Sequence, residues 1–250
     1  MRLSNSPKSI LITGASSGIG EALAKYYAAE GRHLFLTGRN AERLEAVAKA
    51  CRHLKAQVSV AVMDVKDMAA MRRWINVCHH VMPLDLVIAN AGISNSGHVT
   101  TEELDREIFA TNINGVLNTV YPAMHLMQEH HHGQIAIISS LASLHGFARA
   151  AAYCASKAAL TAFGQALRSR LKKYHIKVSV VCPGFIATPL IANSLHFQPC
   201  ILSKEKAAQI IAKGLSQNKG LIAFPRRLYF LLWFLRLLPV KMTEWITSLL

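Results

Sequence analysis

A glycine-rich turn lies between a short apolar run and a helical pattern near the start of the chain. Residues 9–13 (SILIT) are apolar, TGASSGIG follows at 13–20, and EALAKYYAAEG continues with helical spacing. Where a strand is followed by a glycine turn and then a helix, the free amides at the start of the helix can bind phosphate. The order predicts a parallel α/β fold with a phosphate site; an ordinary glycine turn is the weaker alternative.

Three glycines in this turn have separate expected roles. The spacing is G-x-x-x-G-x-G, formed by Gly14, Gly18 and Gly20. Gly14 permits a tight turn, Gly18 lets a pyrophosphate approach the backbone, and Gly20 lets the helix and the strand pack closely. We therefore expect a dinucleotide at this turn.

Further apolar runs alternate with helical patterns along the rest of the chain. The expected strands are 33–37, 57–63, 84–89, 134–139, 176–182 and 220–224, and the expected helices are 41–52, one through Trp74, 101–130 and 150–174. Strands that alternate with helices predict a single α/β domain over 1–250. We expect a doubly wound Rossmann-type parallel sheet of about seven strands with helices on both faces.

The distribution of charged, histidine and cysteine residues argues against nucleic acid and metal ions as partners. The formal net charge is +14, but the lysines and arginines are scattered and no nucleic-acid recognition pattern is present, so we expect no nucleic-acid partner. His125 and the run 130–132 invite a metal hypothesis, yet the run precedes Gly133 at a helix end, where cations suit the helix dipole. The cysteines show neither close pairing nor metal spacing, so we expect a reducing compartment and no metal.

Tyr153 and Lys157 are four residues apart in the pattern 150–174, which puts both side chains on one helix face. A nearby cation favours the phenolate and lowers the pKa of a tyrosine, so the pair can work as acid and base. Ser140 ends the preceding apolar run. A plain amphipathic face is the alternative for the pair alone. A nucleophilic serine is disfavoured, because no G-x-S-x-G pattern surrounds Ser140.

Five motifs together resemble the short-chain dehydrogenase/reductase family. They are TGASSGIG at 13–20, ANAG at 89–92, Asn112, Ser140 and YCASK at 153–157. The resemblance extends from about residue 8 to about residue 224, and the motifs occur in the family's order and intervals. One departure is Ala89, where the family commonly has asparagine.

The resemblance implies a catalytic set of Asn112, Ser140, Tyr153 and Lys157. Tyr153 would exchange a proton with a carbonyl or alcohol oxygen while the nicotinamide passes a hydride. Lys157 would hold the nicotinamide ribose and keep the phenol acidic. Ser140 would donate a hydrogen bond to the substrate oxygen, and Asn112 would hold a water on the proton path.

The resemblance also implies a cofactor site. Its residues are Gly14, Ser16, Ser17, Gly18, Ile19, Gly20, Arg39, Asp64, Val65, Asn90, Ala91, Gly92, Tyr153, Lys157, Pro183, Gly184, Ile186 and Thr188. Asp64 would meet the adenine edge, with helix capping as its alternative. Pro183 to Thr188 match the family's PG-x-x-x-T turn, which meets the nicotinamide amide and the phosphates.

Arg39 bears on the choice of cofactor. An acidic residue after the second strand would bind a ribose 2′-hydroxyl, whereas an arginine suits a 2′-phosphate. Arg39 occupies this place, so we expect NADP(H), with NAD(H) as the alternative. Arg43 and the hydroxyls of Ser16 and Ser17 are possible helpers. A plain surface residue at a turn is the other interpretation of Arg39.

The region 189–217 is where the family places a substrate lid. Its first part, PLIANSLHFQPCIL at 189–202, contains no charged residue. An apolar lid favours a lipophilic ketone or alcohol, such as a long-chain acyl, steroid-like or sphingoid compound. Ordinary packing of this segment against the core is the alternative.

The tail 225–250 is apolar, and its run 228–238 is too short to span a bilayer, which needs about 20 residues. Aromatic and basic residues fit a helix in a membrane interface through 226–250. Packing on the core or on a second subunit is the alternative. The aromatic and basic residues in question are Tyr229, Trp233, Trp245, Arg226, Arg227, Arg236 and Lys241.

The expected function is an NADP(H)-dependent oxidoreductase of lipophilic carbonyls or alcohols. A non-catalytic NADP-binding sensor or scaffold is the second hypothesis, and an epimerase or dehydratase on the same fold is a minor one. Because the family often packs the helix of Tyr153 against a partner, we expect a homodimer or homotetramer. The first strand begins too early for a signal peptide, so we expect a cytoplasmic protein, peripheral at a membrane surface if the tail binds lipid.

Overall fold

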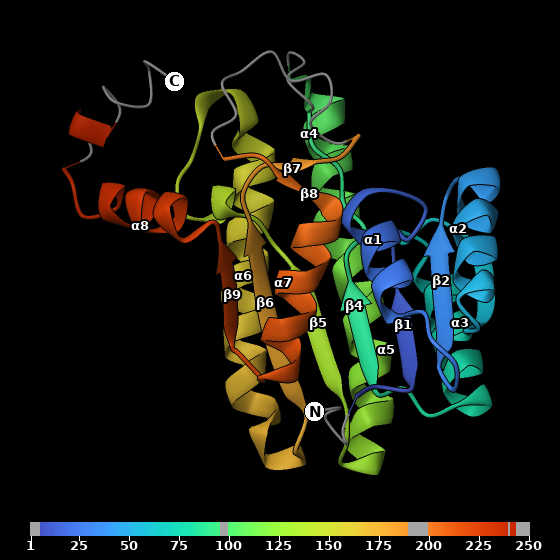
Figure 1. Ribbon diagram of the computed structural model, residues 1–250. Helices are drawn as coiled ribbons and strands as arrows, with labels where there is room; N and C mark the ends of the chain where they lie inside the picture. Colours follow the sequence, from blue (N-terminus) through green and yellow to red (C-terminus); the bar gives the residue numbers. More distant parts are fainter. Residues whose placement is uncertain (1–5, 96–99, 190–199, 240, 244–250) are drawn as a thin grey trace.

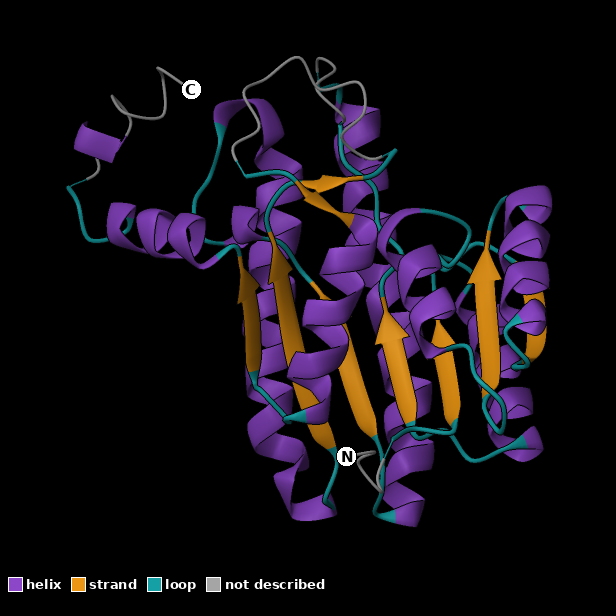
Figure 2. Cartoon of the chain, viewed as in Figure 1, coloured by secondary structure: helices purple, strands orange, loops and turns teal. Residues whose placement is uncertain are grey.

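A seven-stranded parallel sheet forms the centre of the protein (Figures 1 and 2). The computed structural model describes residues 6–95, 100–189, 200–239 and 241–243. The strand order is β3-β2-β1-β4-β5-β6-β9. The strands are β1 (Ser9–Ile12), β2 (His33–Gly38), β3 (Gln57–Val62), β4 (Leu86–Ala89), β5 (Gln134–Ile138), β6 (Lys177–Pro183) and β9 (Leu221–Phe224). The doubly wound fold expected from the sequence is confirmed.

Helices cover both faces of this sheet. One face carries α1 (Gly18–Tyr27), α2 (Ala41–His53) and α7 (Lys204–Ser216). The other carries α3 (Met68–Val81), α5 (Gly115–His130) and α6 (Ala151–Leu171). Two elements lie at the carboxyl end of the sheet, α4 (Glu102–Phe109) and the small pair β7 (Ile186–Ala187) with β8 (Leu202–Ser203).

Alternation along the first strand shows why both faces need a helical layer. Ile10 and Ile12 belong to the core cluster on the α1 side, whereas Leu11 belongs to the cluster on the α3 and α5 side. All three side chains are fully buried. A parallel strand buried on both faces reads as a continuous apolar run, which is what residues 9–12 present.

Successive strands are added on one side of β1 as far as β3 and on its other side from β4 onward. The site lies where this direction changes, between β1 and β4. From β1 the chain continues to β2 on one side, while β4 lies on the other. Ligands of open α/β sheets bind at the carboxyl ends of the strands at such a point. The glycine turn after β1 and the ANAG segment after β4 therefore meet there.

Several predicted boundaries were wrong. The helix expected over 101–130 is divided by a π-helical turn, Ala110–Asn114, between α4 and α5. The helix expected through Trp74 continues to Val81, because Met71, Ile75 and Cys78 form a buried stripe at helical spacing. The helix expected to reach residue 174 ends at Leu171 and is followed by a short 3₁₀ turn.

The predicted lid region 189–217 has two different parts. Residues 190–199 lie outside the described residues. Residues 204–216 form α7, which packs along α1 and buries Ala207, Ala208 and Ile211 against the sheet. This second part is a layer of the core rather than a cover over the site, because its small and branched apolar residues share one helix face.

The C-terminal tail begins with α8 (Arg226–Leu235), which extends sideways from the end of β9 (Figure 1). Residues 240 and 244–250 of the predicted tail lie outside the described residues. Among the described residues, no helix has the length and apolar content needed to cross a bilayer.

Candidate active site

The glycine turn has the backbone shape that the sequence predicted. Gly14 and Gly18 have φ angles of +65° and +59°, in the left-handed region that favours glycine. A Cβ on Gly20 would collide with the Gly14 carbonyl oxygen and would lie 2.6 Å from Asn90 Nδ2. The turn therefore lacks side chains where α1 begins, and its amides are accessible to a phosphate.

Hydrogen bonds from Thr13 join the glycine turn to the end of β4. Thr13 Oγ1 accepts from the backbone amides of Asn90 at 3.0 Å and Ala91 at 3.1 Å. Asn90 Nδ2 donates to the Thr13 carbonyl oxygen at 2.9 Å. Sequence reasoning missed Thr13, although its place at the strand end, directly before Gly14, is a usable signal.

The rest of the turn lies close to the predicted cofactor residues. A Cβ on Gly38 would lie 3.0 Å from Ser16 Oγ, so Ser16 lies beside the end of β2. Ser17 precedes α1 in an extended conformation and its side chain makes no capping hydrogen bond. Ile19 packs against the core on the α1 side of the sheet.

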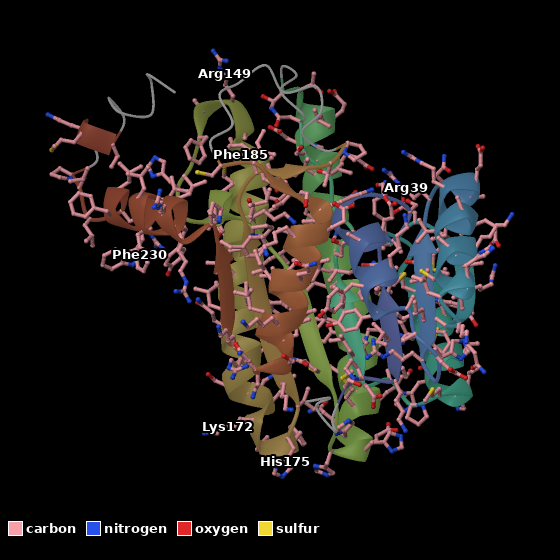
Figure 3. All side chains as sticks on the ribbon, viewed as in Figure 1. Arg39, Arg149, Lys172, His175, Phe185 and Phe230 are labelled. Carbon is pink, nitrogen blue, oxygen red and sulfur yellow. The ribbon has the colours of Figure 1, made fainter. Side chains whose placement is uncertain are left out.

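Arg39 follows β2 at the carboxyl edge of the sheet (Figure 3). Its side chain is 58% exposed, and its Nη1 atom lies 3.9 Å from Asp64 Oδ2. Lys66 Nζ lies 3.7 Å from the same carboxylate oxygen and pairs with Glu107 at 2.7 Å. Two cations thus flank Asp64; Lys66 was missed because no sequence spacing links it to Arg39.

Asp64 and Val65 lie in a loop held by α5. Asp64 Oδ1 accepts from the Lys66 amide at 2.9 Å, while the N-terminal cap of α3 is Asp67. The alternative that Asp64 caps this helix is therefore wrong. Asn118 Nδ2 donates to the Val65 carbonyl oxygen at 2.9 Å, which fixes the loop.

Asn112 lies inside the π-helical turn and is fully buried. Its Oδ1 accepts from the Ile93 amide at 2.8 Å, and its Nδ2 donates to the Ile93 carbonyl oxygen and to Ser156 Oγ, both at 3.0 Å. These bonds explain an asparagine within a helical stretch: it connects the segment after β4 to α6. Such π turns are frequent at functional sites.

Lys157 is buried with 4% of its surface exposed, and its Nζ donates to the Ile138 carbonyl oxygen at 3.0 Å. A Cβ on Gly92 would lie 3.4 Å from this Nζ and 3.1 Å from Asn112 Oδ1, so the ANAG backbone passes close to both side chains. Burial lowers the pKa of Lys157 to about 8. The lysine is therefore a buried, readily perturbed cation.

Tyr153 is half-buried on the same helix, with its ring centre 5.7 Å from Lys157 Nζ. Burial raises the pKa of Tyr153, and a hydrogen bond with the Ser140 side chain opposes this effect. The sequence predicted a lowered pKa for Tyr153, and this prediction is wrong for the net shift, because burial is the largest effect on the phenol. Ser140 Oγ also accepts from the Ala142 amide at 3.1 Å.

Ser139 was also missed by sequence reasoning. Its hydroxyl donates to the Lys157 carbonyl oxygen at 2.8 Å and lies 2.8 Å from Thr161 Oγ1. Because these bonds join the end of β5 to α6, they fix Ser140 relative to Tyr153. The dipeptide Ser139-Ser140 at the end of the apolar run is the signal that was available.

The segment from Pro183 to Thr188 leads from β6 back towards the glycine turn. The Gly184 amide donates to the Phe224 carbonyl oxygen at 2.7 Å, and Ile186 is buried. A Cβ on Gly18 would lie 3.2 Å from the Thr188 methyl carbon. The turn and the segment thus form two walls around the start of α1, and the glycine backbone fits a pyrophosphate between them.

Within the described ranges, no three histidine, cysteine or acidic side chains lie close enough together to hold a metal ion. His130 stacks on His79 with ring centres 4.9 Å apart, and His132 Nε2 lies 3.4 Å from Asp85 Oδ1. These contacts occur at the end of the sheet opposite the site.

Comparison with known proteins agrees with this geometry. Residues 8–198 match the family described as short chain dehydrogenase. An uncharacterized oxidoreductase of Myxococcus xanthus is 32% identical over 225 residues, covering 88% of each chain. A fatty acyl-CoA reductase of Acinetobacter baylyi is 35% identical over 223 residues, covering 86% of this chain and 75% of its own.

A solved structure with the same architecture contains a nicotinamide cofactor. The short chain dehydrogenase of Mycobacterium paratuberculosis bound to NAD superposes with a TM-score of 0.76 at 25% identity, covering 86% of this chain and 93% of its own.

Proposed function

Because this chain belongs to the short-chain dehydrogenase family and is an oxidoreductase that uses a nicotinamide cofactor, we propose that it prefers NADP(H) and interconverts a lipophilic ketone and its alcohol. The observation that carries the chemistry is the meeting of Tyr153, Ser140, Lys157 and Asn112 beside the glycine turn. The Ser140 side chain lies near enough to the Tyr153 phenol to lower its pKa, and Lys157 and Asn112 both lie close to Gly92.

The proposed roles follow from these positions. When bound, the nicotinamide supplies or accepts the hydride. Tyr153 holds the proton that passes between its phenol oxygen and the substrate oxygen. Ser140 Oγ donates a hydrogen bond to that oxygen, which stabilises charge developing on it. Lys157 holds a ribose hydroxyl, and Asn112 keeps the Ile93 segment and α6 in register around it.

The proposed cofactor site extends from the glycine turn to the segment after β6. Gly14, Ser16, Ser17, Gly18, Ile19 and Gly20 would surround the phosphates, and Thr188 would close over them. Asp64 and Val65 would meet the adenine. Asn90, Ala91, Gly92, Pro183, Gly184 and Ile186 would border the nicotinamide half.

The NADP(H) preference rests on charge around the adenosine end. Arg39 is exposed and Lys66 lies near it, with Asp64 between them. A ribose 2′-phosphate would add an anion to this cluster, which an arginine fork can hold in a bidentate manner. NAD(H), without this phosphate, gains less from the same residues.

The proposal of a lipophilic substrate is based on the apolar sequence 189–202 and on the relative named fatty acyl-CoA reductase. We propose the same substrate class for this chain.

We also propose a homodimer or homotetramer, formed through α6, and contact with a membrane surface through the tail. The alanines exposed along one side of α6 are Ala151, Ala155, Ala158, Ala159, Ala162 and Ala166.

The first experiment compares NADPH and NADH oxidation with long-chain and steroidal ketones in detergent. We expect turnover with NADPH on the lipophilic ketones. Arg39→Asp should raise the KM for NADPH about tenfold or more, since hydrogen bonds to charged groups contribute about 1.5–3 kcal/mol. Arg72→Asp, at an exposed position on α3, is the matched control and should leave this KM unchanged.

Two outcomes would contradict the proposal. An equal KM for NADPH in Arg39→Asp and wild type would show that Arg39 does not bind the 2′-phosphate. Tight NADPH binding without turnover on any ketone or alcohol would favour the alternative, a non-catalytic sensor or scaffold.

A further inference from the structure

Helix α8 exposes an apolar surface to solvent. Phe230, Leu231, Trp233, Phe234 and Leu237 are between 47% and 61% exposed, although all are large apolar side chains. Figure 3 shows Phe230 on α8, away from the central sheet. Five such residues on and directly after one short helix form a continuous stripe, and large exposed apolar patches mark contact sites.

The opposite face of α8 is anchored to the body of the protein. Leu232 and Leu235 are buried in one cluster with Leu141, Val180 and Cys182. The burial of Leu232 and Leu235 fixes the orientation of α8, so the stripe faces solvent. A rotation of α8 that buried the stripe would expose Leu232 and Leu235 instead.

Among the residues of the tail that the structure describes, every charge around the stripe is positive. Arg226 and Arg227 form the first turn of α8, Arg236 follows its last turn, and Lys241 lies shortly beyond. Between Lys206 and Thr243 the chain has no acidic residue. Two arginines in a first turn oppose the helix dipole, which favours anions at that end. An external anion at this place would therefore be stabilised twice, by the arginines and by the dipole.

We propose that α8 binds the surface of an anionic lipid bilayer, an inference that rests on the membrane contact in the proposed function and names the helix and the lipid charge involved. The stripe enters the boundary between headgroups and acyl chains, while the arginines extend to the phosphates. A second copy of this chain is the poorer occupant, because pairing α8 with α8 about a two-fold axis would bring these cations together without an acidic residue among them. Lipid headgroups supply the complementary charge.

The position of α8 ties lipid binding to the substrate entrance, an extension that rests on the proposed function. Leu141 follows Ser140 directly and packs in the cluster of Leu232. A Cβ on Gly184 would lie 3.3 Å from Leu228 and 3.4 Å from Leu141, so α8 also contacts the segment after β6. Helix α8 thus separates a bilayer bound at the stripe from the segments that follow Ser140 and β6, and we infer that a lipophilic ketone enters the site from this side of the molecule.

The test is cosedimentation of the full chain with phosphatidylcholine vesicles, with and without about one-third phosphatidylglycerol. Wild type should bind the anionic vesicles much better and be released by salt, since the surface potential decays within a Debye length. Leu231→Glu with Phe234→Glu should lose at least tenfold in binding. Arg226→Gln with Arg227→Gln should lose about fivefold for each arginine removed.

Matched controls separate this proposal from the proposed function. Val77 and Val81 on α3 are 54% and 59% exposed, and Val77→Glu with Val81→Glu should leave vesicle binding unchanged. NADPH binding and reduction of a small soluble ketone should be the same in all α8 variants, so a chain without activity can still bind vesicles.

Three results would overturn the proposal. They are absence of wild-type binding, equal binding to neutral and anionic vesicles, and unchanged binding of the Leu231→Glu and Phe234→Glu variant. A molar mass in solution that falls in this variant, without vesicle binding of the wild type, would assign the stripe to a second copy.

Discussion

At Lys157 the requirements of folding and of chemistry conflict. Its ammonium is buried beside Tyr153 and, among the described residues, donates one hydrogen bond, to the Ile138 carbonyl oxygen. Burial of a charge costs free energy that one neutral acceptor offsets only in part. A bound ribose hydroxyl would give the ammonium a second partner, so the cofactor should stabilise the folded chain.

Replacement of Lys157 by methionine isolates this cost through its pH dependence. The pKa is about 8 in the folded chain and about 10.4 in an unfolded one. From pH 8 to pH 10 the unfolded wild type binds more protons than the folded state, so its free energy of unfolding rises with pH. Wild type should therefore gain about 2 kcal/mol relative to Lys157→Met between pH 7 and pH 10. Urea unfolding measures this gain. If the difference in free energy of unfolding between wild type and Lys157→Met does not vary with pH, burial does not lower the pKa of Lys157.

Among the elements, α3 carries an acid-sensitive contact at its last turn. His79 is buried, its Nδ1 accepts from the Leu84 amide at 3.3 Å, and its Nε2 has no hydrogen-bond partner among the described residues. Burial lowers the pKa of His79, and the neighbouring His130 and His80 lower it further. The folded state therefore keeps this ring neutral.

His79→Asn should weaken the response of the protein to acid. Below about pH 6.5 an unfolded histidine takes up a proton, whereas the folded His79 does so only at lower pH, so wild-type stability falls as the pH decreases. Asparagine can accept from Leu84 without titrating. Thermal unfolding at pH 7 and pH 5 should show a smaller loss for this variant. His53→Gln, at an exposed position on α2, should behave as wild type; an equal loss in all three proteins would contradict the explanation.

The elements also show how far sequence reasoning extends. Strands were predicted well because β1, β2, β4, β5 and β6 are apolar runs buried on both faces, whereas the edge strand β3 is only partly buried. The site residues could be placed because they follow strand ends. The π turn at 110–114 could not be predicted, since it depends on contacts of Asn112 with Ile93 and Ser156, which are distant in sequence. Helix α7 was missed because the family resemblance implied a lid over the whole of 189–217, although residues 204–216 have apolar residues at helical spacing.

For the whole molecule, the exposed alanines of α6 give a test of assembly. Small side chains allow two helices to approach closely, and Tyr121 on α5 is 38% exposed with its ring centre 6.0 Å from that of Phe163 on α6. Ala162→Arg should place a charge in this interface and reduce the molar mass from that of an oligomer to that of one chain. Light scattering after gel filtration measures it. Ala46→Arg on α2 is the control; an unchanged mass in Ala162→Arg would exclude α6 as the contact.

Proton transfer by Tyr153 is the step on which the proposed reaction depends. The most direct measurement compares Tyr153→Phe with wild type for NADPH affinity and for single-turnover reduction of a lipophilic ketone. We predict an unchanged NADPH affinity and a rate lower by about 10²- to 10⁴-fold, the usual contribution of a positioned acid or base. A rate comparable to wild type would contradict the claim.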